Sequence, residues 1–190
     1  MCDIKRLAIF ALISSSDTHL VRLEQHYLTS LTGNSMALGF PVHITVKGRF
    51  LANQNAVEKV ISDAGLSIGS NIPTPICVQL SEPKYIAPQL SWLEVLPSSE
   101  GFSQLTFLHQ LFEQRIKEFV VEDEVPEAHK NSGFCPHITL GWGVTPQTWQ
   151  EYSTNRKHIL EQTQISHIAL ACYPYNWPIN ESVDLATIPV

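Results

Sequence analysis

The sequence lacks the features that mark several large classes of protein. Four cysteines are scattered through 190 residues without a Cys-x-x-Cys pair, which disfavours a zinc ribbon or a disulfide framework and makes a reduced, cytoplasmic protein the expectation. No apolar run reaches the roughly 18 residues that a membrane span requires. The N-terminal stretch "MCDIKRLAIFALISSSD" has Asp3 in its basic region and ends in a poor cleavage site. We therefore interpret it as a buried first strand rather than a signal peptide.

Positive charge is also scarce. The chain has 12 Lys and Arg against 18 Asp and Glu, a formal net charge of −6, and it has no basic block. A protein that holds long nucleic acid by its backbone needs a basic stripe to displace counterions. Extended nucleic-acid binding is therefore disfavoured, whereas a small anionic ligand, or just the end of an RNA, fits this composition if the few cations converge. We expect a monomer with no membrane partner.

The hydrophobic pattern predicts an α+β protein in which one order of elements occurs twice. Each half gives a strand, a helix, a strand beginning His-Ile-Thr, a helix and a strand. We expect a single domain over 1–190 with two pseudosymmetric lobes, 1–80 and 81–190, each an antiparallel sheet with flanking helices, around a central cleft that holds both motifs. The expected strands are 6–13, 42–50, 76–80, 90–96, one from residue 137, 165–173 and 183–188; the expected helices are 17–33, 54–64, one from residue 103 and 145–160.

The repeated motif is the most specific signal in the sequence. "PVHITVKGRF" contains His43 and Thr45, and "CPHITLGWG" contains His137 and Thr139. Of the eight histidines, these are the two with a serine or threonine two positions later, and in both copies an isoleucine stands between. Side chains at i and i+2 of a strand point to the same side, so each strand would present an imidazole and a hydroxyl about 7 Å apart.

The same alternation extends the two polar faces. It places Lys47 and Arg49 beside Thr45, and it continues the second strand with two glycines, Gly141 and Gly143, that leave room for a ligand. By this reasoning Trp142 faces the core. A cationic face opposite an open one suits an anion between them.

Two histidines on opposite sides of a phosphodiester can divide the proton transfers. One takes a proton from the attacking water or hydroxyl, and the other gives a proton to the departing oxygen. The unperturbed imidazole pKa of about 6.5 suits both roles, and the threonine hydroxyls can donate to the non-bridging oxygens. This scheme requires no metal and no cofactor, and the sequence does not tell which histidine is the base.

The two motifs resemble those of the 2H phosphoesterase superfamily, which includes the bacterial RNA 2',3'-cyclic phosphodiesterases called 2'-5' RNA ligases. The match rests on His43 with Thr45 and His137 with Thr139, and the length and order of elements fit it across the chain. The resemblance implies a metal-independent phosphodiesterase acting on a 2',3'-cyclic phosphate, a 1'',2''-cyclic ADP-ribose phosphate or a 2'-5' linkage. Because relatives acting on RNA are expected to carry more cations, the acidic composition favours a small nucleotide or a terminal nucleotide.

Further candidates are less specific. Lys47 and Arg49 are candidate phosphate contacts, and Tyr85 in the proline-flanked "EPKYIAP" loop is a candidate for stacking on a base. Trp92, Trp142 and Tyr173 are weaker stacking candidates. Cys135 reads as a buried thiol, and the helical histidines His19, His26, His109 and His158 are expected to be solvated or to cap helices.

Two other functions stay open. A nucleotide-binding module could have kept the cleft without turnover, although it would not need both proton carriers. A metal-dependent hydrolase could use both histidines with a carboxylate, although neither motif shows the His-x-His or neighbouring acid that is usual at such sites. Ligation by the same histidines would be a side activity, because water favours hydrolysis.

Overall fold

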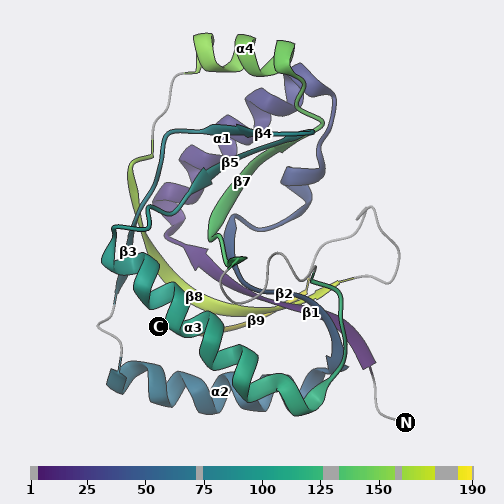
Figure 1. The fold of residues 1–190 in the computed structure, drawn as a ribbon, viewed down its shortest axis with the longest axis vertical. Coiled ribbons are helices and arrows are strands. Elements are labelled where there is room, and N and C mark those ends of the chain that lie inside the picture. The colour runs from purple at the N-terminus through teal and green to yellow at the C-terminus, as the bar shows by residue number, and fades with distance from the viewer. Residues whose placement is uncertain (1–3, 72–74, 126–132, 157–159, 174–183, 190) are drawn as a thin grey trace.

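Two antiparallel sheets form the framework of the molecule (Figure 1). The computed structural model describes residues 4–71, 75–125, 133–156, 160–173 and 184–189. The large sheet has six strands in the order β3-β8-β1-β2-β6, with β9 also paired to β8. The small sheet has the order β4-β5-β7. The strands of the large sheet are β1 (Ile4–Ile13), β2 (His43–Asn53), β3 (Ile76–Gln79), β6 (Val120–Asp123), β8 (Gln162–Tyr173) and β9 (Asp184–Pro189), and those of the small sheet are β4 (Lys84–Ile86), β5 (Leu90–Glu94) and β7 (His137–Trp142).

The helices divide between the two sheets. Helices α2 (Gln54–Asn71) and α3 (Glu100–Ile116) pack on the large sheet, whereas α1 (Ser15–Thr32) and α4 (Pro146–Asn155) lie with the small sheet (Figure 1). The 3-10 turns η1 (Met36–Gly39) and η2 (Lys117–Phe119) follow α1 and α3, and η1 contacts β7. Among the described helices, none is long and apolar enough to cross a membrane.

The predicted α+β class is confirmed, but the sheets do not follow the two halves of the chain. Strands β6, β8 and β9 come from the second half and join the sheet of β1 and β2. The reason lies in β1, whose apolar run from Leu7 to Ala11 is fully buried. Such a central strand needs a partner on each edge to satisfy its backbone groups. Strand β2 pairs with one edge of β1, and β8 pairs with the other.

The two faces of β1 serve different purposes. Leu7, Ile9 and Ala11 belong to the main core under the helices, whereas Ala8 and Phe10 form a smaller cluster on the other face. This smaller cluster is partly covered by Phe40. Phe10 therefore reaches the side of the sheet on which the first motif presents its histidine.

Several predicted helix ends need correction. The N-cap of α1 is Ser14, which accepts from the backbone N–H of Asp17 at 3.3 Å; the Asp17 carboxylate instead accepts from the Thr163 hydroxyl at 2.6 Å. Helix α2 continues past residue 64 to Asn71, and α3 begins at Glu100, three residues before the predicted start.

Other predicted ends are confirmed. Gly33 ends α1 with a left-handed φ of 70°, which glycine adopts without a steric penalty. Thr145 caps α4, and Pro146 occupies its first turn. The predicted continuation of α4 toward residue 160 is wrong, because the helix ends at Asn155; part of that continuation lies outside the described residues.

A buried hydrogen bond joins the two helices of the small sheet. The hydroxyl of Tyr152 on α4, which is fully buried, donates to Glu24 Oε2 on α1 at 2.5 Å. Burial, followed by this contact with the carboxylate, raises the pKa of Tyr152. The phenol therefore stays protonated and serves as the donor that the buried Glu24 carboxylate requires.

The substitution Tyr152→Phe is expected to cost about 1–3 kcal/mol of unfolding free energy, because it leaves the buried Glu24 carboxylate without this donor. Urea unfolding followed by circular dichroism measures the loss. The matched control is Tyr85→Phe, whose hydroxyl donates to Pro88 O near solvent and whose loss should stay within about 0.5 kcal/mol. Equal losses in the two variants would contradict this account.

Candidate active site

Strands β2 and β7 each begin at the histidine of a His-Ile-Thr motif. Ile44 and Ile138, between the histidine and the threonine, are buried in the core at 0% and 1% exposure. The histidine and threonine of each motif lie on the opposite side and line one common pocket. The predicted alternation therefore holds through the threonine in both strands.

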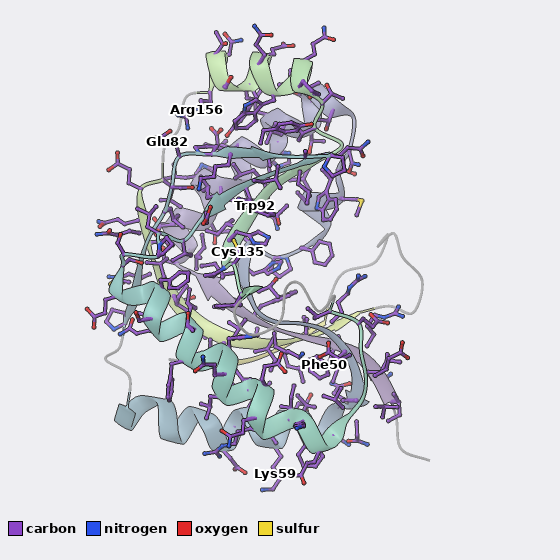
Figure 2. All side chains as sticks on the ribbon, in the orientation of Figure 1. Phe50, Lys59, Glu82, Trp92, Cys135 and Arg156 are labelled. Carbon is purple, nitrogen blue, oxygen red and sulfur yellow. The ribbon has the colours of Figure 1, made fainter. Side chains whose placement is uncertain are left out.

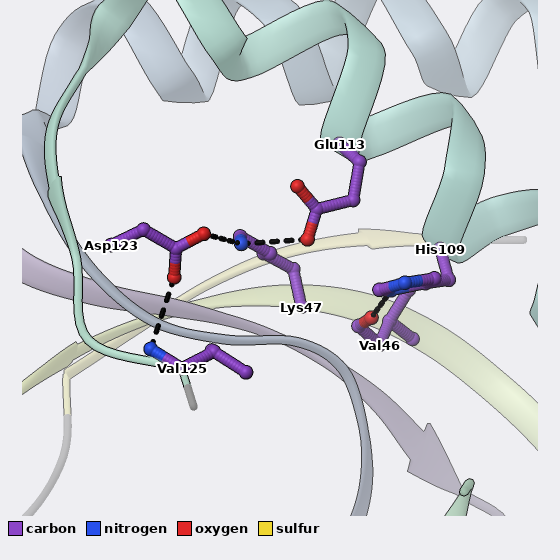
Figure 3. A network of polar contacts seen from close by, with 6 residues as sticks. All are labelled: Val46, Lys47, His109, Glu113, Asp123 and Val125. Atoms are coloured by element: carbon purple, nitrogen blue, oxygen red, sulfur yellow. Dashed lines mark hydrogen bonds and ion pairs between the residues drawn. The ribbon is translucent and has the colours of Figure 1, made fainter. Parts of the chain in front are cut away.

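Alternation ends one residue after the threonine of β2. Thr45 lies opposite Phe10 of β1 and Lys47 lies opposite Ile9, so Val46 is an extra residue without a partner in the register. Such a β-bulge turns the following side chain to the other face of the strand. His109 of α3 is hydrogen-bonded through Nδ1 to the carbonyl oxygen of Val46 at 2.8 Å (Figure 3).

Strand β7 has the same irregularity at the same place. Thr139 lies opposite Trp92 of β5 and Gly141 lies opposite Ser91, so Leu140 is the extra residue. Leu140 and Gly141 are both buried. In each motif the residue that follows the threonine is therefore a bulge.

The two bulges overturn two predictions. Lys47 is not on the face of His43 and Thr45: it is 1% exposed and forms ion pairs away from the pocket. Trp142, predicted to face the core, lines the pocket instead. Both errors come from extending a strict two-residue period through a strand that contains an extra residue.

Both imidazoles are oriented by the same kind of bond. His43 Nδ1 lies 2.7 Å from the carbonyl oxygen of Pro41, and His137 Nδ1 lies 2.8 Å from that of Cys135. A carbonyl oxygen only accepts, so Nδ1 carries a hydrogen in both rings. Nε2 is then the nitrogen that can take or give a proton.

Both imidazoles also stack on an aromatic ring of the neighbouring strand. Phe10 stacks on His43 with the ring centroids 3.6 Å apart, and Trp92 stacks on His137 at 4.1 Å. Each aromatic residue stands opposite the threonine of the motif that it supports. Trp92 belongs to β5 and lies near the middle of the view in Figure 2. Trp92 is thus a support for the histidine rather than a free stacking platform.

The pocket between the motifs has a volume of about 520 Å³, within the range of small-molecule sites. Its lining combines the two motifs, the segment around η1 and the segment after β6. The lining residues are Gln25, Ala37, Phe40, Pro41, His43, Thr45, Gly48, Arg49, Glu124, Val125, His137, Thr139 and Trp142.

The environment of His43 favours its neutral form. The pKa of His43 is lowered from 6.5 to about 4, mainly by burial; the bond to Pro41 opposes the shift, and the charges of His137 and Arg22 add to it. A histidine that stays neutral at neutral pH, with its hydrogen on Nδ1, offers an unprotonated Nε2. This arrangement suits a proton acceptor.

Helix α1 ties the two motifs together through a pair that the sequence analysis missed. Arg22 donates to Gln25 Oε1 at 2.8 Å and to the carbonyl oxygen of Phe40, three residues before His43. The buried Gln25 donates to the carbonyl oxygen of Thr139 at 2.8 Å. Nothing in the local sequence of a helix reveals such a bridge, because its acceptors are distant backbone carbonyls.

Of the remaining candidates, some line the pocket and others lie elsewhere in the structure. Arg49 is 44% exposed, lines the pocket and lies 4.0 Å from Glu124. Tyr85 is not part of the pocket lining; its ring stacks on Trp149 at 6.2 Å. His109, expected to be solvated or to cap its helix, is 4% exposed and stacks on Phe134. The side chain of Tyr173 and residue 158 lie outside the described residues.

Cys135 is exposed as a residue, not buried as predicted. Partial burial of its sulfur, followed by the charge of Glu94, still raises the pKa of its thiol. The raised pKa disfavours a thiolate nucleophile. Among the described residues, no group of three or more His, Cys, Asp or Glu side chains is arranged to hold a metal ion.

Comparison with solved structures identifies the class of fold. Escherichia coli LigT, solved with 3'-AMP, is 14% identical to this chain, with coverage of 97% and 95% of the two chains and a TM-score of 0.53. Kluyveromyces marxianus Usb1 is 14% identical, with coverage of 100% and 99% and a TM-score of 0.54. Usb1 with uridine monophosphate gives 12% identity, coverage of 100% and 99%, and a TM-score of 0.51.

This chain therefore shares the fold of LigT and Usb1. No protein-family model matches the sequence, and no curated protein is significantly similar to it.

The state of His43 can be measured directly. In ¹⁵N-labelled protein the His43 imidazole should stay neutral, with hydrogen on Nδ1, until the pH approaches about 4. The unfolded chain takes up this proton near pH 6.5, so the folded state binds fewer protons between pH 6.5 and 4. Stability should therefore fall as the pH drops through this window, and His43→Gln should reduce that fall. A His43 ring that is protonated at pH 6 would contradict this account.

Proposed function

We propose that this protein is a metal-independent phosphodiesterase acting on a cyclic or 2'-linked nucleotide phosphodiester by two-histidine acid–base catalysis. Candidate substrates are a nucleoside 2',3'-cyclic phosphate, an RNA end and a small nucleotide. The observation that carries the proposal is the matched anchoring of His43 and His137, whose Nδ1 atoms both bond to the carbonyl two residues earlier. The 3'-AMP and uridine monophosphate in the LigT and Usb1 structures support a nucleotide ligand.

The two histidines are assigned different roles. His43, with its lowered pKa, takes the proton of the attacking water at Nε2 while the water oxygen bonds to phosphorus. His137, protonated at Nε2, donates that proton to the 2' or 3' oxygen as its bond to phosphorus breaks. The hydroxyls of Thr45 and Thr139, on the same strand faces, donate to the non-bridging oxygens, where charge builds up.

The walls of the pocket support a short substrate. A volume of about 520 Å³ accommodates a ligand of mononucleotide size. Arg49 supplies a cation for the phosphate, but Glu124 stands beside it with a negative charge. Longer polyanions would bring further phosphates toward a protein of net charge −6.

Removing either histidine should abolish most of the activity. Hydrolysis of uridine 2',3'-cyclic phosphate in excess EDTA is the assay, and His43→Ala or His137→Ala should each lower kcat/KM by about 10² to 10⁴. His19→Ala, an exposed helical histidine, is the matched control and should keep wild-type rates. A variant of either motif histidine that turns over at the wild-type rate would remove that residue from the mechanism.

The same assay distinguishes the alternative functions. A binding module would bind uridine 3'-monophosphate without turning over the cyclic phosphate, and a metal-dependent hydrolase would lose its activity in EDTA. Full activity in EDTA, lost in the histidine variants, is the outcome that the proposal requires.

The pH dependence of kcat/KM should show the roles of the histidines. Because the base form of His43 persists down to about pH 4, the acidic decline should lie well below pH 6.5 and the activity should fall again on the alkaline side, where the proton donor is lost. An acidic decline centred near pH 6.5 would contradict the assignment of His43 as the base.

A further inference from the structure

Lys47, turned inward by the bulge at Val46, is a buried cation held between two carboxylates (Figure 3). Its side chain is 1% exposed, and its Nζ lies 2.6 Å from Glu113 Oε1 of α3 and 2.7 Å from Asp123 Oδ2 at the end of β6. A buried ammonium group is costly unless it is paired. The two carboxylates therefore stabilise the charge of Lys47 together, but Glu113 belongs to α3 and Asp123 belongs to β6.

Asp123 connects Lys47 to the wall of the pocket. Its second oxygen, Oδ1, accepts from the backbone N–H of Val125 at 3.0 Å (Figure 3). Val125 and its neighbour Glu124 line the pocket. One carboxylate thus binds the buried cation and the backbone of the wall segment, which we define as Glu124–Val125.

The wall segment lies directly on the bulged part of β2. A Cβ atom added to Gly48 would lie 2.4 Å from Val125 Cγ2, so glycine is needed for this close approach. The backbone N–H of Glu124 donates to the carbonyl oxygen of Arg49 at 3.0 Å. The wall segment therefore packs against the strand that carries the first motif.

The wall segment also sets the electrostatics around Arg49. The Glu124 carboxylate accepts from Arg6 Nε at 2.9 Å and lies 4.0 Å from Arg49 Nε. The position of Glu124 decides how much of the Arg49 charge is available to a phosphate in the pocket. A displaced wall segment would change both the shape and the charge of this end of the pocket.

We infer that Lys47 is a positioning residue that acts through Asp123 to hold the wall segment, and that this buried pair sets the affinity for the nucleotide without touching it. The inference rests on the proposed function, since it assigns the same pocket to a nucleotide. Glu113 binds the same ammonium group but belongs to α3 and holds no part of the wall. The two carboxylates therefore form a matched pair in which one should affect substrate binding and the other should not.

The experiment compares Asp123→Ala with Glu113→Ala, using uridine 2',3'-cyclic phosphate. Asp123→Ala should raise KM about five- to thirtyfold, the upper part of the range for residues that act without touching the ligand, with kcat within about twofold of wild type. Glu113→Ala should leave KM within about twofold, although both variants lose one ion pair of Lys47. Partial unfolding lowers the amount of active enzyme, so it would not produce a difference between the two variants that is confined to KM.

Lys47→Met should reproduce the effect of Asp123→Ala, and the double variant should show no larger effect than either single variant, because both act through one pair. Lys59→Met, which removes the exposed pair with Asp63, is the control for loss of a lysine. If Lys47 bound the phosphate itself, Asp123→Ala would release its ammonium group and leave KM unchanged or lower it. That result, or an equal rise in Asp123→Ala and Glu113→Ala, overturns the inference; should Lys47→Met fail to fold, the comparison of the two carboxylates still decides.

Binding of uridine 3'-monophosphate by calorimetry separates this inference from the proposed function. If the wild type binds this nucleotide without turning over the cyclic phosphate, the proposed activity fails. The ratio of Kd values for Asp123→Ala and Glu113→Ala then decides the positioning role. Wild-type protein that shows neither binding nor turnover overturns both.

Discussion

The extra residue after the threonine of each motif is the constraint on which the site depends. Up to that threonine, strict alternation presents a histidine and a hydroxyl to the pocket and buries the isoleucine between them. The bulges at Val46 and Leu140 then change the face of the sheet to which the following side chains point. In β2 this change sends Lys47 into the core, where it pairs with Asp123 of β6, whose second oxygen accepts from the backbone N–H of Val125 in the wall segment. In β7 it brings Trp142 into the pocket.

Matched supports and unequal surroundings give the two histidines different chemistry. Each ring is anchored through Nδ1 to a carbonyl two residues earlier and stacked on an aromatic side chain of the adjacent strand. These supports limit rotation of both rings, as pre-organised catalysis requires. The surroundings differ in burial and charge, which lower the pKa of His43 to about 4. The unequal roles proposed for the two imidazoles follow from their surroundings rather than from the motifs.

The sequence predicted the α+β class, most of the elements and the two motifs, because strand alternation, helix caps and a repeated His-x-Thr are local patterns. It did not predict the pairing of β8 with β1, since strand order depends on contacts between distant segments. Lys47 and Trp142 were misplaced because a bulge leaves no mark in the alternation of "HITVKGRF" or "HITLGW". The bridge from Arg22 and Gln25 to backbone carbonyls has no sequence pattern at all. The residues of the motifs could thus be predicted from the sequence, but the strand register that orients their neighbours could not.

A crystal structure with uridine 3'-monophosphate, one of the two products that hydrolysis of uridine 2',3'-cyclic phosphate can give, tests most directly whether both strands serve one phosphate. The account predicts that the phosphate lies between Nε2 of His43 and Nε2 of His137, each about 3 Å from a phosphate oxygen. The hydroxyls of Thr45 and Thr139 should then bond to the remaining oxygens. A phosphate held by Arg49 and distant from either imidazole would contradict the account.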